Sequence, residues 1–80
     1  MKIGPYAVRI VQVGDVYGTH AVRNDFDQPM VEFSLGGTML SRYFASTLQR
    51  NPKGIMIDPH HPHLTAEQLT PLLEKLACLP

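Results

Sequence analysis

Three histidines and an aspartate gather in residues 58–63, which read Asp-Pro-His-His-Pro-His. Neutral imidazoles and carboxylates are ligands that zinc and nickel accept in proteins. Neighbouring residues on extended backbone point to opposite sides, so one ion would not take all four side chains. The pairs that share a side are His61 with His63 and Asp58 with His60. The candidate metal ligands are His61 and His63, and the alternative is a solvated histidine loop that precedes a helix.

Nucleophilic side chains occur in the chain without an arrangement that would activate them. No strand, nucleophile and helix signature surrounds Cys78 or the serines Ser34, Ser41 and Ser46, and no paired acid stands in a recognisable place. A chain of 80 residues also has little room to enclose a substrate pocket. We therefore expect no enzyme activity and no cofactor.

The segment Gly36-Gly37-Thr38 precedes a predicted helix, whose free N–H groups and positive dipole end could receive a phosphate or carboxylate. No Walker-type lysine follows it, and the glycine pattern lacks the length of a dinucleotide fingerprint. A simple turn from strand to helix, with Thr38 as the N-cap, is the favoured interpretation.

Arginine and aromatic side chains supply most of the binding energy at protein interfaces. Phe26 is an apolar side chain among turn-forming residues, which suits either a fold back onto the core or an exposed anchor. If the basic residues share one face they could form a local nucleic-acid patch, and a dispersed, solvated surface is the favoured alternative. The candidate binding residues are Arg9, Tyr17, Arg23, Phe26 and Arg42.

The composition narrows the class of partner. Seven basic residues balance seven acidic ones, which argues against a strongly basic nucleic-acid binder and against an acidic mimic of DNA. Cys78 is the only cysteine, so no internal disulfide can form, and the N-terminal residues contain no apolar stretch long enough for a signal peptide or a membrane span. We expect a cytoplasmic protein that is not bound to membranes.

The pattern of apolar residues predicts the elements that position these side chains. Strands are expected over residues 6–13, 17–23 and 30–35, where β-branched and aromatic residues alternate between turn signals. A helix is expected over residues 39–50, then a brief strand over 55–57 against the sheet edge. A second helix follows the capping box of Thr65 and Gln68, with Pro71 as a point of kink or restart.

This order predicts a single domain over residues 1–80 of the α+β class, with a small antiparallel sheet of three to four strands and two helices packed on one face. The last helix carries many leucines, and so small a core is not expected to cover all of them. A homodimer that buries Leu72, Leu76 or Leu79 is therefore a further prediction.

Three stretches carry a resemblance to a known group: Val13-Gly14-Asp15-Val16-Tyr17-Gly18, Pro29-Met30-Val31-Glu32-Phe33, and Ser41-Arg42-Tyr43-Phe44-Ala45-Ser46-Thr47-Leu48. In these the chain resembles short uncharacterised bacterial proteins of plasmids and integrative elements. Members of that group have a longer acidic and aromatic segment where this chain has Ser34-Leu35-Gly36-Gly37. The resemblance implies the setting of a mobile genetic element, phage or plasmid, whose small proteins commonly modulate host machinery by binding it.

The leading hypothesis is a non-enzymatic inhibitor or accessory protein, of the anti-CRISPR or anti-restriction kind, that binds a host protein or ribonucleoprotein complex. One alternative is a metal-binding module that uses the loop from His60 to His63. The other is a small nucleic-acid-binding regulator.

Overall fold

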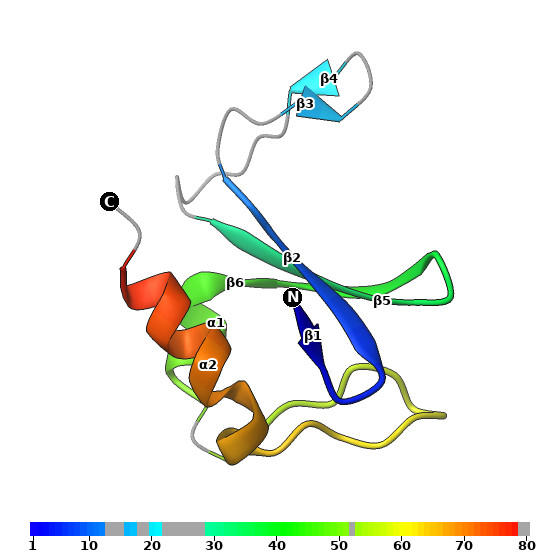
Figure 1. The fold of residues 1–80 in the computed structure, drawn as a ribbon, viewed down its shortest axis with the longest axis vertical. Coiled ribbons are helices and arrows are strands. Elements are labelled where there is room, and N and C mark those ends of the chain that lie inside the picture. Colours follow the sequence, from blue (N-terminus) through cyan, green and yellow to red (C-terminus); the bar gives the residue numbers. More distant parts are fainter. Residues whose placement is uncertain (13–15, 18–19, 22–28, 52, 79–80) are drawn as a thin grey trace.

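The computed structural model describes residues 1–12, 16–17, 20–21, 29–51 and 53–78. Its main sheet has four strands in the order β1-β2-β5-β6, and each strand runs antiparallel to its neighbours (Figure 1). These strands are β1 (Lys2–Ile3), β2 (Tyr6–Val11), β5 (Met30–Leu35) and β6 (Thr38–Phe44). The described residues also form two helices, α1 (Ala45–Gln49) and α2 (Ala66–Ala77). The predicted α+β class with a small antiparallel sheet is confirmed.

The core lies between the sheet and the helices. Alternation along β2 and β5 turns Tyr6 and Val8, and then Val31 and Phe33, toward one side, and all four are buried. The rings of Tyr6 and Phe33 meet edge to face at 6.5 Å. Against this side pack the buried helical residues Ala45, Leu48, Leu69, Leu72 and Leu76. Both helices therefore lie on the same side of the sheet (Figure 1).

The helix predicted over residues 39–50 is wrong for its first half, which forms strand β6. Gly36 and Gly37 have φ angles of 60° and 83°, which suit a two-residue hairpin turn and bring Leu35 opposite Thr38. The chain therefore turns back along β5, and the ring of Tyr43 packs edge to face on Phe33. The apolar spacing that resembled a helix is satisfied by strand pairing. Within residues 39–50 only α1 is helical, and its N-cap position is Phe44 in place of Thr38.

Two of the predicted strands also differ from those in the structure. Residues expected as one strand over 17–23 contribute to two short strands, β3 (Val16–Tyr17) and β4 (His20–Ala21), which pair with each other. Residues 55–57 form no strand at the sheet edge. Ile55 instead makes an isolated bridge to Leu64, which closes the histidine loop.

Gly54 allows that bridge. Its φ angle is 100°, and a Cβ there would lie 2.1 Å from the carbonyl oxygen of Leu64. No other residue could occupy this position without moving the bridge. The loop from 56 to 63 is thus held at its base by a close backbone contact.

The second helix follows its sequence signals. Thr65 accepts a hydrogen bond from the backbone N–H of Gln68, and the Gln68 side chain accepts one from the N–H of Thr65, so the predicted capping box is present. The helix continues through Pro71, which is exposed, so the missing N–H donor falls on the solvent side. Leu72 and Leu76 are already buried within their own chain, and Leu79 lies outside the described residues. The homodimer stays a prediction, and neither Leu72 nor Leu76 is exposed to form its interface.

Candidate functional site

The side of the sheet opposite the helices gathers two of the five predicted binding residues, Arg9 and Arg42. The strand register places its residues in three rows that cross the strands. The middle row is Arg9, Glu32 and Arg42. We call this surface the outer face, and its members are Lys2, Ala7, Arg9, Val11, Met30, Glu32, Ser34, Met39, Arg42 and Phe44.

An ion pair fixes the middle row. The Nε and one Nη of Arg42 donate to the same Oε2 of Glu32, at 3.0 and 2.7 Å. The side chain of Glu32 is only 9% exposed, whereas that of Arg42 is 43% exposed. The Glu32 carboxylate therefore lies nearly buried in the sheet surface, and its two hydrogen bonds hold the Arg42 guanidinium in one orientation. Such preorganisation lowers the entropy that an arginine loses when it binds a partner.

The outer face is positively charged although the chain as a whole is neutral. Among the residues that the structure describes, Lys2, Arg9 and Arg42 are the exposed cations of this face and Glu32 is its one carboxylate, whereas the complete chain has seven residues of each sign. Lys2 belongs here because it pairs with Ala7, whose side chain points away from the core. Three of the seven basic residues therefore share one surface, which supports a local patch over full dispersal.

Apolar side chains flank the charged row. Met39 is 48% exposed and lies beside Arg42, whose Nη2 is 3.8 Å from its sulfur. At the other end Val11, Met30 and Phe44 form a row, with Val11 buried outside the main core cluster. A cationic centre with an exposed methionine is the mixture of charge and apolar area that protein interfaces use.

The structure does not describe the side chains of the other three predicted binding residues. Tyr17 lies in β3, and its side chain is not among the described ones, while Arg23 and Phe26 fall outside the described residues. Sequence reasoning missed Glu32 and Met39. The alternation of β5 did put Glu32 on the polar face, but the strand that carries Arg42 and Met39 was expected to be a helix.

The predicted phosphate or carboxylate site at Gly36-Gly37-Thr38 is ruled out by the fold. These residues form the β5–β6 turn and the start of a strand, so no helix begins there to offer free N–H groups and a dipole. The favoured interpretation, a turn from strand to helix with Thr38 as the N-cap, was also wrong, because the turn joins two strands and Thr38 lies in β6.

The histidine loop is organised around Asp58. Its Oδ1 accepts a hydrogen bond of 2.7 Å from the backbone N–H of His60 and lies 3.2 Å from Nδ1 of His61. The N–H of His60, and then the neighbouring His61, lower the pKa of the Asp58 carboxyl below 3.8. The carboxylate thus orders the turn that presents the histidines.

Both His61 and Pro62 contact Tyr6, and these contacts hold the histidine loop against the core. The His61 ring meets that of Tyr6 edge to face at 6.2 Å, and the Tyr6 hydroxyl donates to the carbonyl of Pro62 at 3.0 Å. Burial raises the pKa of Tyr6 above 10.0, with the Asp58 charge adding to the effect. Among the described residues no three of His, Cys, Asp and Glu gather closely enough to hold a metal ion. A site made by His61 and His63 alone stays a prediction.

Comparisons of the chain with protein-family models, with curated proteins and with solved structures found no match. Within the described residues, neither helix is long and apolar enough to cross a membrane. The functional assignment therefore depends on the geometry of the chain itself.

Proposed function

We propose that this chain is a non-enzymatic binding protein whose outer face docks on a host protein or ribonucleoprotein complex and blocks the surface it covers. The observation that carries the proposal is the row Arg9, Glu32 and Arg42 beside the exposed Met39. Arginine is one of the side chains that most often dominate the binding energy at interfaces. The partner surface would carry carboxylates to complement the cations of this face.

A protein partner suits this face better than nucleic acid. Contacts to phosphates need several cations with few neighbouring acids, whereas here Glu32 already neutralises part of the charge at the centre. The apolar side chains of Met39 and Phe44 share the face and favour a partner with apolar groups of its own. An inhibitor of the anti-CRISPR or anti-restriction kind is the specific form that we propose, supported by the small size of the chain and its resemblance to proteins of mobile elements.

Quantitative affinity capture from the native host tests this proposal. The bait is the full chain, compared with the charge reversal Arg9→Glu on the outer face and Lys53→Glu on an exposed position away from the sheet. We expect a protein that the unchanged chain and the Lys53 variant recover equally, and that Arg9→Glu recovers roughly tenfold less. Thermal melting of all three baits would confirm that each is folded.

Two results would overturn the proposal. One is the absence of any protein whose recovery depends on Arg9. The other is tight, salt-sensitive binding of the purified chain to DNA or RNA that Arg9→Glu abolishes, because phosphate contacts weaken steeply as salt rises. That second result would favour the nucleic-acid-binding regulator.

A further inference from the structure

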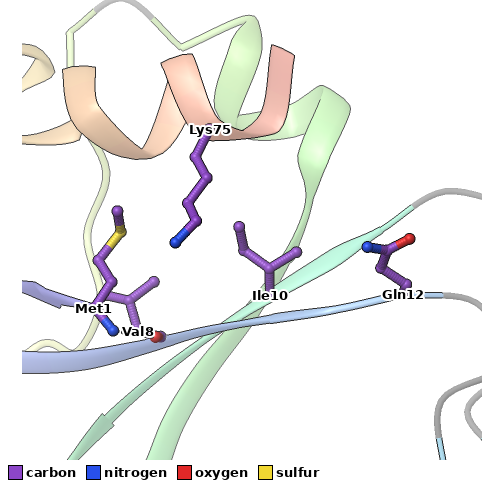
Figure 2. Close-up of a pocket in the computed structure, with 5 residues that line it drawn as sticks. All are labelled: Met1, Val8, Ile10, Gln12 and Lys75. Carbon is purple, nitrogen blue, oxygen red and sulfur yellow. Dashed lines mark hydrogen bonds between the residues drawn. The ribbon is translucent and has the colours of Figure 1, made fainter. Parts of the chain in front are cut away.

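A pocket of about 280 Å³ opens between β2 and α2, on the helix side of the sheet and away from the outer face (Figure 2). Five residues line it: Met1, Val8, Ile10, Gln12 and Lys75. Val8 and Ile10 belong to β2, and Lys75 projects from the last turn of α2 toward them (Figure 2). Its volume lies just below the range of typical ligand sites, which is roughly 300–1,000 Å³.

The pocket exists because the strands differ in length. β1 pairs only with Ala7 and Tyr6, and the backbone of Met1 then bonds that of Val8, with the Val8 N–H donating at 2.8 Å. Beyond Val8, none of the described strands pairs with the edge of β2 that faces β1. Ile10 is therefore only half-buried, although it packs against the main core. The floor of the pocket is an uncovered part of the core.

The lining selects for a particular ligand chemistry. Lys75 is the only one of the five side chains with a charge, and Met1 adds its N-terminal ammonium, so these five residues supply cations and no carboxylate. The Lys75 ammonium is exposed, and a charge-assisted hydrogen bond from it to an anion is stronger than a bond between neutral groups. Val8 and Ile10 favour a hydrocarbon group against the floor.

We infer that this pocket binds a small monocarboxylate with a short aliphatic tail. The carboxylate contacts the Lys75 ammonium, and the tail lies on Val8 and Ile10 beneath α2. The ligand covers the part of the core that β1 leaves open. This site is independent of the outer face, so a ligand could be bound while the outer face holds a partner.

The test uses the purified full chain and sodium hexanoate, with binding followed by the amide NMR signals. We expect saturable shifts centred on Val8, Ile10 and Lys75. Hexylamine has the same tail and the opposite charge, and it should leave these signals unchanged. Lys75→Gln should weaken hexanoate binding roughly tenfold, the scale of one hydrogen bond to a charged group. Lys53→Gln, at an exposed position outside the pocket, should bind as the unchanged chain does.

Three outcomes would overturn the inference: shifts that do not saturate or that centre elsewhere, equal binding of hexanoate and hexylamine, and equal loss in the Lys75 and Lys53 variants. None of these bears on the outer face. Lys75 is exposed, so its replacement leaves the fold intact, and the amide spectrum itself reports this.

Discussion

Arg42 on β6 donates two hydrogen bonds to a single carboxylate oxygen of Glu32 on β5, and the two residues are directly opposite in the register. Loss of Arg42 would remove an ion pair and two hydrogen bonds from a nearly buried carboxylate. That costs about 3–5 kcal/mol for a fully buried pair, and less here because Arg42 is 43% exposed. We expect Arg42→Ala to lower the free energy of unfolding by about 1–2 kcal/mol, measured by urea denaturation.

The matched control for this prediction is Arg50→Ala, an exposed residue at the end of α1. It should change stability by less than about 0.5 kcal/mol. Equal losses in the two variants would mean that the pair with Glu32 does not order the outer face.

Tyr6 should make stability fall in alkaline solution. Its pKa is raised by burial, so the folded chain keeps the hydroxyl proton at a pH where the unfolded chain loses it. The contribution of Tyr6 to the free energy of unfolding is fully present below pH 10.0, which equals the pKa of a free tyrosine. It is lost as the pH rises through the folded pKa. Tyr6→Phe should remove this part of the decline, and it should cost about 0.5–1.5 kcal/mol at neutral pH through the lost bond to Pro62. An unchanged alkaline profile in this variant would refute the assignment.

Asp58 should act in the opposite direction, in acid. Its pKa is lowered by the His60 N–H and by His61, so its contribution is present above 3.8, and it is lost as pH falls through the folded value. Asp58→Asn keeps an acceptor for the His60 N–H but has no charge to lose. Its unfolding free energy should therefore fall less between pH values on either side of 3.8 than that of the unchanged chain. Glu74→Gln, an exposed carboxylate on α2, is the control and should keep the original slope.

Ser41 offers a substitution that should stabilise the chain. It pairs with Phe33 on the core side of β6, and its buried Oγ has no hydrogen-bond partner among the described residues. Ser41→Ala removes this unsatisfied group, so we expect the free energy of unfolding to rise by up to about 1 kcal/mol. A loss of stability in the thermal melt would show that the hydroxyl is bonded in solution.

Sequence reasoning succeeded where the signal was local. The capping box of Thr65 and Gln68 and the alternation of β5 both depend on neighbouring residues, and both are present in the structure. It failed at β6, because Leu40, Tyr43 and Phe44 fit a helical stripe as well as a strand. The segment is a strand because it pairs with β5, and the turn at Gly36 and Gly37 brings it into position for this pairing.

The candidate site could likewise be predicted only where residue type alone was enough. Arg9 and Arg42 could be chosen by residue type, but their common face could not, since it required the register of three strands. Glu32 gained its role only once β6 was a strand that brought Arg42 opposite to it. The pocket under α2 could not be read from the sequence, because it arises where β1 stops pairing with β2.

The most direct test of the binding face is site-specific photocrosslinking at two methionines of equal exposure. Met39 lies on the outer face and is 48% exposed, while Met56 lies in the histidine loop segment and is 49% exposed. A photoreactive residue at position 39 should link the chain to one defined host protein in its native cells, and the same residue at 56 should not. A protein linked equally from both positions, or only from 56, would contradict the account.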